Sequence, residues 1–410
     1  MENMKKCGLL GRRLSHSYSP KIHGKLASYE YSLFEVEPEE LDAFMRAGEF
    51  DSINVTVPYK TEVIPYMSEL SDTARRIGSV NTVVKRADGT YFGDNTDYFG
   101  FTYMLVRAGI DVENKKVLVL GSGGSSKTVC TALSDLGASE VVVISRTGKD
   151  NYVNISRHFD AEIIVNTTPV GMYPKNMESP VSLDGFERLL AVVDLIFNPR
   201  ITALGFDAQE KGIKYTSGLP MLVAQAKAAS ERFTGKAVDD ACIERIITEI
   251  ERETENIILV GMPGCGKSTV GRIIAEKLGR EFVDIDEEIV KTHGKSIPDI
   301  FREEGESAFR AYEHEEICRV CAGSSLVIAT GGGAPTKENN IRPIRQNGRV
   351  VFIERDISEL SRGGRPLSQG ADLEAMYKDR LPHYLAVSDI TVKSAPTPTI
   401  TAAAMIEKLK

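Results

Sequence analysis

Eight residues, 261–268, constrain the fold of this chain more than any other segment. They read Gly-Met-Pro-Gly-Cys-Gly-Lys-Ser, follow the apolar run 256–260 and precede apolar residues at helical spacing. Glycines in such a turn let backbone N–H groups point at phosphate oxygens, and the helix start favours negative charge. The segment therefore predicts a phosphate-binding loop in a parallel α/β domain. Lys267 is expected on the β- and γ-phosphates and the Ser268 hydroxyl on Mg²⁺. The expected nucleotide contacts are Gly264, Cys265, Gly266, Lys267, Ser268 and Thr269.

The same strand-then-glycine pattern occurs twice earlier in the chain, at 6–11 and at 116–124. A length of 410 residues exceeds one ordinary domain, and 42% apolar residues are enough for several cores. A charged helical run at 243–255 separates the third pattern from the first two. The sequence thus predicts two or three α/β domains, with a boundary near Glu253.

Charge and composition argue against several classes of protein. The net charge of −8 argues against a nucleic-acid or polybasic membrane partner. No apolar run approaches the roughly 20 residues of a membrane helix, and the start of the chain does not resemble a signal peptide. Six scattered cysteines predict a reducing, cytoplasmic compartment, with Cys318 and Cys321 packed in a core rather than binding zinc. The sequence predicts no oligomeric state.

Residues after the phosphate-binding loop indicate what kind of molecule could accept the phosphoryl group of a bound nucleotide. Asp284 and Asp286 lie two apart in a strand-like run, which places both on one face for a metal and a substrate hydroxyl. A solvated strand end is the alternative. Three consecutive glycines, 331–333, follow the apolar run 326–329 and admit close approach of a small acceptor. The remaining candidates are arginines: Arg310, Arg365 and Arg380.

These features occur in the order of one enzyme family. Residues 256–393 carry GxxxxGKS, FxDxD, GExxFRxxE, GGG, RPL and RxPxY, and so resemble shikimate kinase, a phosphate-binding-loop fold of the nucleoside-monophosphate-kinase type. The resemblance implies MgATP-dependent phosphorylation of shikimate at its 3-hydroxyl. Asp284 and Ser268 would organise Mg²⁺, Asp286 would accept the hydroxyl proton, and Arg365 would close over the phosphates from a lid shorter than is usual in the family. Arginine suits the shikimate carboxylate because its planar fork binds both oxygens. The implied shikimate contacts are Asp286, Arg310, Gly331, Gly332, Gly333 and Arg380.

The first half of the chain carries weaker signals, each with an ordinary alternative. Ser17 and Ser19 can bind a carboxylate, although the Ser-Pro step favours a simple helix start. Alternation along the strand-like run after Ser52 places Asn54 and Thr56 on one face. Lys60, taken alone, is typical of a solvated surface lysine. Two further polar candidates follow, Asn81 and Asp97.

Together these signals resemble the substrate domain of shikimate dehydrogenases. The segments are HSxSP, NVTxPxK, GxVNT and GDNTD, and 218–226 resembles a later motif of the same family. The resemblance implies NADPH-dependent reduction of 3-dehydroshikimate to shikimate with Lys60 and Asp97 as the catalytic pair. A lysine ammonium can stabilise the negative charge that builds on the ketone oxygen and can donate the proton. The implied substrate contacts are Ser17, Ser19, Asn54, Thr56, Lys60, Asn81, Asp97 and Gln225.

The strand at 116–120 and the glycines after it predict a dinucleotide site. The match to GxGxxG is partial, because Ser126 stands at the third glycine. Arg146 follows the next strand, where NAD sites usually have an acid, and arginine suits the 2′-phosphate of NADP. A surface arginine is the alternative. The expected NADP contacts are Gly121, Ser122, Gly123, Gly124, Ser125, Ser145, Arg146, Thr147, Thr167 and Gly218.

Two departures from the dehydrogenase family stand out. Phe197 occupies the usual tyrosine position of the DxxYNP motif, which keeps the ring and removes the hydroxyl. The segment 147–162 is too short for a full helix, strand and helix, so the cofactor domain is expected to lack about one βα unit. Both departures bear on the cofactor side more than on the substrate side.

The predicted architecture is therefore α/β throughout. A substrate domain spans 1–100, and 219–250 returns to it; a shortened Rossmann NADP domain spans 101–218; a linker spans 251–255; and the kinase domain spans 256–410. The predicted function is a fused pair of consecutive enzymes of aromatic amino-acid (chorismate) biosynthesis. Two alternatives stay open for the first half: a preference for quinate or NAD, or a role only in binding or scaffolding.

Overall fold

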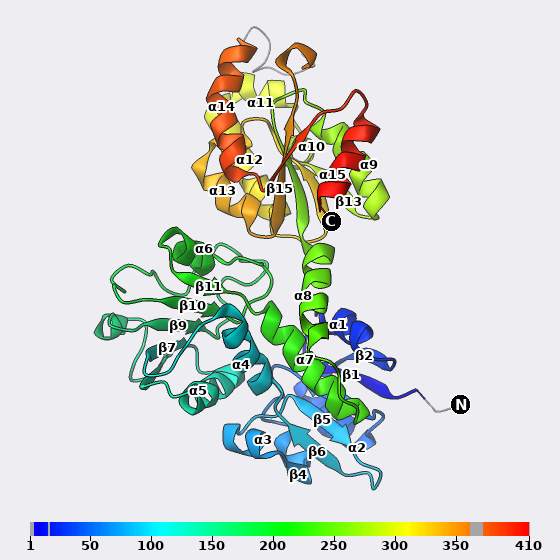
Figure 1. The fold of residues 1–410 in the computed structure, drawn as a ribbon, viewed down its shortest axis with the longest axis vertical. Helices are drawn as coiled ribbons and strands as arrows, with labels where there is room; N and C mark the ends of the chain where they lie inside the picture. The colour runs from blue at the N-terminus through cyan, green and yellow to red at the C-terminus, as the bar shows by residue number, and fades with distance from the viewer. Residues whose placement is uncertain (1–3, 15–16, 361–371, 410) are drawn as a thin grey trace. The chain divides into compact units, whose positions relative to one another are not determined.

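The computed structural model describes residues 4–14, 17–360 and 372–409. These residues form two compact units. The first holds the chain up to Gly171, Glu178–Phe197 and Leu204–Glu251, and the second holds Met172–Met177, Asn198–Ala203 and the chain from Arg252 onward. Figure 1 labels most helices and many strands of the two units, which are described one at a time.

The first unit begins with a six-stranded mixed sheet in the order β2-β1-β3-β5-β6-β4. Its strands are β1 (Lys6–Gly11), β2 (Glu30–Glu35), β3 (Ser52–Val55), β4 (Glu69–Leu70), β5 (Thr82–Lys85) and β6 (Tyr91–Asp94), and its helices are α1 (Ser19–Leu26), α2 (Leu41–Ala47) and α3 (Asp72–Ile77). The antiparallel register pairs Thr82 of β5 with both Asn54 and Asp94. Polar residues at the ends of three adjacent strands therefore gather at one edge of the sheet.

The second sheet of this unit is parallel, in the order β11-β10-β9-β7-β8. Its strands are β7 (Lys116–Leu120), β8 (Glu140–Ile144), β9 (Ile163–Asn166), β10 (Ala191–Asp194) and β11 (Lys214–Thr216). A doubly wound dinucleotide domain has one more strand beyond β8. The connection from β8 to β9, described along its whole length, contains only a 3₁₀ turn at Ile155–His158. The expected loss of about one βα unit is confirmed at this point.

The two faces of this parallel sheet are covered differently. One face packs against α4 (Asp97–Ala108) and α5 (Gly124–Asp135). The other face packs against α6 (Ala203–Glu210) and against apolar residues of irregular segments, such as Leu183 and Phe186. Loop side chains thus keep the sheet covered on the face that the missing βα unit leaves short.

Two long helices complete the first half of the chain. Helix α7 (Leu219–Thr234) packs with α1 around Ile22. Helix α8 (Ala241–Thr254) buries a stripe of four isoleucines at 243, 246, 247 and 250. That stripe keeps the chain helical through Thr254, so only Glu255 of the expected 251–255 linker lies between α8 and the next strand. The domain boundaries themselves remain a prediction.

The second unit is built on a parallel sheet in the order β13-β14-β12-β15-β16. Its strands are β12 (Asn256–Val260), β13 (Glu281–Asp284), β14 (Leu326–Ala329), β15 (Gly348–Glu354) and β16 (Ile390–Lys393). Its helices are α9 (Lys267–Leu278), α10 (Ile285–His293), α11 (Ile297–Glu303), α12 (Gly305–Cys321), α13 (Glu338–Arg345), α14 (Leu373–Val387) and α15 (Pro398–Leu409). All five residues of β12 are buried, as expected for a strand covered on both faces. The predicted α/β class is confirmed in both units.

One local prediction is wrong in detail. Asp286 does not share a strand with Asp284, because β13 ends at Asp284 and helix α10 begins at the next residue. Asp284 is the N-cap of that helix, and its Oδ1 accepts a hydrogen bond from the Asp286 backbone N–H at 3.0 Å. An aspartate at this position stabilises a helix start, so capping overrides the alternation that the run 282–286 suggested.

Within the part of the chain that the structure describes, no helix is long and apolar enough to cross a membrane. The same residues contain no group of three or more metal-ligating side chains. Cys318 and Cys321 are free thiols on α12, and Cys321 is fully buried.

Candidate active sites

Lys60 and Asp97 form an ion pair in the first unit. Lys60 lies in the turn after β3 and Asp97 is the first residue of α4, and Lys60 Nζ lies 2.6 Å from Asp97 Oδ2. The two side chains are only 13% and 10% exposed. The Lys60 carbonyl accepts a hydrogen bond from Val80 N–H at 2.7 Å, which anchors the turn. The local pattern favoured a solvated lysine, whereas the fold buries Lys60 against a carboxylate 37 residues away.

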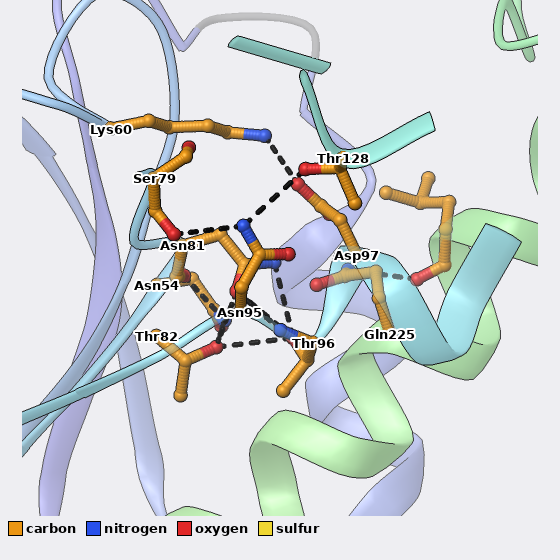
Figure 2. A network of polar contacts seen from close by, with 11 residues as sticks. Asn54, Lys60, Ser79, Asn81, Thr82, Asn95, Thr96, Asp97, Thr128 and Gln225 are labelled. Carbon is orange, nitrogen blue, oxygen red and sulfur yellow. Dashed lines mark hydrogen bonds and ion pairs between the residues drawn. The ribbon is translucent and has the colours of Figure 1, made fainter. Parts of the chain in front are cut away.

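A network of amide and hydroxyl groups fixes the start of α4 (Figure 2). Asn81 Oδ1 accepts hydrogen bonds from Thr96 N–H at 2.7 Å and from the Thr82 hydroxyl at 3.0 Å, and Asn81 Nδ2 donates to Thr96 Oγ1 at 3.1 Å. Asn54 Nδ2 donates to the Asn81 carbonyl at 3.3 Å. Because Thr96 precedes Asp97, this network sets the position of the Asp97 carboxylate.

Two buried oxygen atoms near Lys60 have no hydrogen-bond partner among the described residues, Asn95 Oδ1 and Ser79 Oγ. Asn95 Nδ2 donates to the Ser79 carbonyl at 2.9 Å (Figure 2). A Cβ atom at Gly124 would lie 3.7 Å from Lys60 Cδ and 3.9 Å from Ser79 Oγ. The start of α5 therefore lies against Lys60 and beside the Ser79 hydroxyl.

The serine segment connects to the same region through Tyr31. Helix α1 begins at the Ser19-Pro20 step, as the local pattern favoured, but its N-cap is Tyr18 and no side chain caps it. Ser17 Oγ accepts a hydrogen bond from Ser19 N–H at 3.2 Å. Ser19 is buried and lies beside Tyr31, whose pKa is raised by burial and lowered in part by the Ser19 hydroxyl. The Tyr31 hydroxyl donates to Asn54 Oδ1 at 2.8 Å. Ser19 and Asn54, predicted as substrate contacts, are thus linked through one tyrosine that the sequence did not single out.

The other predicted substrate contacts lie on neighbouring elements. Thr56 follows β3 directly. Gln225 lies on α7 with its Nε2 donating to the Leu222 carbonyl at 2.8 Å. A Cβ atom at Gly100 would lie 2.5 Å from the Met221 carbonyl and 3.0 Å from Gln225 Cβ. A glycine is therefore needed at position 100 for α7 to approach α4. Gln225 contacts α4 at Gly100, which lies one helical turn after Asp97.

Phe197 keeps an aromatic contact in this region. Its ring lies 5.0 Å from the ring of Tyr18, at an interplanar angle of 54°. Tyr18 stands between the two predicted substrate serines. The aromatic ring at this position is therefore used for packing against the serine segment, which phenylalanine does as well as tyrosine.

The turn after β7 fits a dinucleotide phosphate. Gly121 has φ +104°, and a Cβ atom there would lie 2.8 Å from Thr167 Oγ1. Gly123 is the N-cap of α5, with no side-chain cap and with open space around it. The free N–H groups of this 12-residue helix point at that space, which suits a pyrophosphate. The same turn carries Ser122, Gly124 and Ser125.

The predicted 2′-phosphate contacts lie next to that turn. Gly121 N–H donates to the Ile144 carbonyl at 2.8 Å, so the end of β8 adjoins the glycine turn. Arg146 and Thr147 follow and are exposed, and Ser145 is half-buried. Gly218 lies farther along the chain, where a Cβ atom would lie 2.0 Å from the Leu195 carbonyl. The contact of these residues with NADP stays a prediction.

The phosphate-binding loop of the second unit has the expected geometry. Gly264 and Gly266 adopt φ +84° and +99°, and Gly266 is the N-cap of α9 with no side-chain cap. Lys267 is buried, and its Nζ donates to the carbonyls of Gly261 and Met262 at 2.9 and 3.1 Å. Such a loop with an uncapped helix start fits nucleotide phosphates.

Two oxygen-bearing side chains meet beside this loop. The Ser268 hydroxyl donates to Asp284 Oδ2 at 2.6 Å. Hydroxyl and carboxylate oxygens are ligands that Mg²⁺ prefers, together with phosphate oxygens. The pair is therefore fit to hold Mg²⁺ on a bound nucleotide.

Each glycine of 331–333 faces a different group. A Cβ atom at Gly331 would lie 2.6 Å from Glu313 Oε1 and 3.2 Å from Asp286 Oδ1. One at Gly332 would lie 2.7 Å from Pro263 Cδ, and one at Gly333 would lie 2.8 Å from the terminal nitrogens of Arg310. The glycine segment thus lies between the predicted acceptor residues and the phosphate-binding loop, and no side chain could be added without displacing one of them.

Glu313 belongs to this site, although the sequence reasoning gave it no role. It is fully buried on α12, and its Oε2 accepts a hydrogen bond from Arg310 at 2.8 Å. Burial raises the pKa of Glu313, and the nearby Arg310 and Arg380 charges oppose that rise. The spacing from Arg310, three residues on a helix, was a signal available in the sequence. Glu313 orients the Arg310 guanidinium toward the glycine segment.

A second feature that sequence reasoning missed is a cavity of about 830 Å³ at the carboxyl ends of β15 and β16. Arg355, which lines it, also approaches the phosphate-binding loop, because a Cβ atom at Gly266 would lie 3.9 Å from its guanidinium. The cavity therefore adjoins the nucleotide side of the site. Arg365 lies outside the described residues.

Two family models match the chain. The shikimate dehydrogenase substrate-binding domain matches residues 9–83, and shikimate kinase matches residues 263–410. Shikimate dehydrogenase (NADP(+)) of Clostridium beijerinckii is 36% identical over 266 residues, which cover 60% of this chain and 98% of the relative.

Solved shikimate dehydrogenases resemble the N-terminal part of the chain. A chorismate mutase/shikimate 5-dehydrogenase fusion protein from Clostridium acetobutylicum has a TM-score of 0.57 and 36% identity, covering 61% of this chain and 98% of that one. Shikimate 5-dehydrogenase from Thermus thermophilus, in complex with NADP(H) and shikimate, has a TM-score of 0.55 and 31% identity. The match covers 60% of this chain and 99% of that structure's chain.

Proposed function

The chain belongs to the shikimate dehydrogenase family over its N-terminal part and carries a shikimate kinase domain after it, and from this premise we propose how its residues perform two consecutive reactions. It is a bifunctional enzyme of the shikimate pathway that uses NADP(H) and ATP with Mg²⁺. The first reaction is reduction of 3-dehydroshikimate, and the second is phosphorylation of the resulting shikimate. The observation that carries this proposal is that one chain holds both the Lys60–Asp97 pair and the Lys267–Ser268 phosphate loop.

In the reduction, NADPH supplies the hydride when it is bound at the glycine turn after β7. As negative charge builds on the ketone oxygen, the Lys60 ammonium stabilises it and donates the proton. Asp97 holds Lys60 in place through the 2.6 Å contact and helps to restore its proton. We assign Ser17, Ser19, Asn54, Thr56, Asn81 and Gln225 to substrate binding.

In the phosphorylation, MgATP supplies the phosphoryl group. Lys267 neutralises phosphate charge, while Ser268 and Asp284 provide oxygens for Mg²⁺. Asp286 orients the acceptor hydroxyl and accepts its proton, and Arg310 and Arg380 bind the carboxylate. Arg365 stays a predicted phosphate contact.

Two assays on the full chain test this proposal. NADPH absorbance with 3-dehydroshikimate measures the first reaction, and release of ADP with shikimate measures the second. We expect turnover in both, and 3-dehydroshikimate with NADPH and MgATP together should yield shikimate 3-phosphate. A chain that binds 3-dehydroshikimate but does not oxidise NADPH would instead support a binding or scaffolding role for the first half. Faster turnover with quinate and NAD would favour the other alternative.

Arg146→Ala should weaken NADP binding without affecting NAD. Loss of a charged hydrogen bond to the 2′-phosphate is expected to raise the KM for NADP by about tenfold to a hundredfold. Steady-state rates with both cofactors measure this, and Arg157→Ala, another exposed arginine after β8, serves as the control. An unchanged NADP preference in the Arg146 variant would place the 2′-phosphate elsewhere.

We also propose a reducing, cytoplasmic compartment, small-molecule substrates, and no nucleic-acid or membrane partner. The six cysteines are all free thiols, which suits a reducing environment. The net charge of −8 disfavours nucleic acid and anionic membrane surfaces.

A further inference from the structure

Tyr384 has a buried hydroxyl that the roles assigned above do not use. It lies on α14, is fully buried, and its ring stacks on Phe352 of β15 with centroids 5.2 Å apart. Its hydroxyl donates to the Gly332 carbonyl at 2.6 Å and lies 3.8 Å from Met262 Sδ. The strong hydrogen bond goes to Gly332, since a hydroxyl has only one hydrogen to donate.

Gly332 and Met262 belong to loops that serve different substrates. Met262 is part of the phosphate-binding loop after β12, whereas Gly332 is the centre of the glycine segment after β14. The two loops touch directly, because a Cβ atom at Gly332 would lie 2.7 Å from Pro263 Cδ and 3.0 Å from Pro263 N. The Tyr384 hydroxyl therefore sits where the nucleotide loop and the acceptor loop meet.

The same helix also supplies an acceptor contact. Arg380 lies one turn before Tyr384 on α14. Burial raises the pKa of Tyr384, whereas the Arg380 charge and the Arg380 side-chain hydrogen bond to the hydroxyl lower it. The protonated hydroxyl donates to the Gly332 carbonyl. Arg380 therefore lies beside the tyrosine hydroxyl that contacts both loops.

We propose that Tyr384 is a positioning residue for phosphoryl transfer, holding the Gly331–Gly333 segment against the phosphate-binding loop so that the acceptor hydroxyl and the transferred phosphate keep a fixed separation. This proposal rests on the kinase function stated above. In-line transfer depends steeply on such alignment, since an error of about 1 Å can lower the rate about a hundredfold. Without the hydroxyl, the half-buried Gly332 carbonyl would lose this partner, and the segment would shift to satisfy it.

Tyr384→Phe in the full chain tests this role, because it removes the hydroxyl and keeps the ring packing on Phe352. We expect kcat for shikimate phosphorylation to fall by about tenfold to a hundredfold, while the separately measured Kd values for shikimate and for ATP change by less than about threefold. We also expect more ATP to be hydrolysed to ADP and phosphate per shikimate 3-phosphate formed. That ratio does not depend on how much of the protein is folded, and circular dichroism on heating checks folding independently.

Two matched variants sharpen the test. Tyr312→Phe removes an exposed hydroxyl that donates to Glu304 at 2.7 Å, and it should leave every kinase parameter unchanged. Replacing Tyr384 with 4-aminophenylalanine restores a donor at the same point of the ring and should recover most of kcat. The proposal is overturned if Tyr384→Phe keeps the wild-type kcat and product ratio, or if kcat and the two affinities fall together. A wild-type chain that phosphorylates no shikimate would refute the kinase function itself, which is a distinct result.

Discussion

Replacing Lys60 with alanine is expected to lower kcat for the NADPH-dependent reduction by about a thousandfold. The Lys60 ammonium is the only described cation in contact with Asp97. Its loss removes both the charge that stabilises the developing alkoxide and the proton donor. Absorbance of NADPH with saturating 3-dehydroshikimate measures the effect. Phosphorylation of shikimate by the same protein should be unchanged.

A second lysine–aspartate pair in the same unit provides the control. Lys211 Nζ lies 2.9 Å from Asp184 Oδ1, but these side chains are 44% and 83% exposed. Lys211→Ala should therefore leave the reduction rate at the wild-type value, since exposed ion pairs contribute little. A Lys60 variant that retains most of its activity would show that the proton comes from another group, and would remove the main argument for the catalytic pair.

The Lys60–Asp97 pair also shows where sequence reasoning reaches its limit. A lysine after a short strand is ordinarily solvated, and nothing within ten residues of Lys60 indicates otherwise. Lys60 is buried because its side chain contacts Asp97 at the start of α4 and because the Val80 N–H donates a hydrogen bond to the Lys60 carbonyl. Only the order of several motifs along the chain pointed to this pair, because local periodicity carries no information about contacts between distant segments.

The phosphate-binding loop was predictable for the opposite reason. Its function depends on backbone N–H groups and on the consecutive residues Gly266, Lys267 and Ser268. The local sequence therefore determines nearly all of the loop geometry. The shortened cofactor sheet was predictable too, because a missing βα unit removes residues that can be counted. The prediction that the strand extends over 282–286 is wrong because Asp284 caps α10. The sequence pattern is compatible with both an extended strand and a helix cap, and it does not decide between them.

Glu313 and Tyr384 were missed although both stand within recognised motifs. Each acts on a neighbour, Glu313 on Arg310 and Tyr384 on the Gly332 carbonyl. The Arg310–Glu313 spacing is readable on one helix. The Tyr384 contact joins residues 52 apart and is visible only in the fold.

Lys267→Ala should lower the rate of shikimate phosphorylation by about a thousandfold or more and leave the reduction of 3-dehydroshikimate unchanged. In the described structure Lys267 Nζ is bound to two carbonyls of its own loop, at 2.9 and 3.1 Å, and is thereby held at the loop that would cradle the phosphates. Alanine leaves the phosphate charge without this neutralising ammonium, in a site where burial strengthens charge interactions.

The matched control is Lys277→Ala, because Lys277 lies in the last turn of the same helix and is exposed. It should keep full activity in both reactions, which excludes a general effect of losing a lysine from α9. ADP release with shikimate and NADPH absorbance with 3-dehydroshikimate, measured on one preparation of each variant, separate the two sites. If Lys267→Ala reduced both rates equally while the chain stayed folded, the two reactions could not be catalysed by independent sites. If Lys267→Ala loses only phosphorylation, the Lys60 site must work without the Lys267 site. Combined with the selective loss of reduction in Lys60→Ala, this result assigns one reaction to each site.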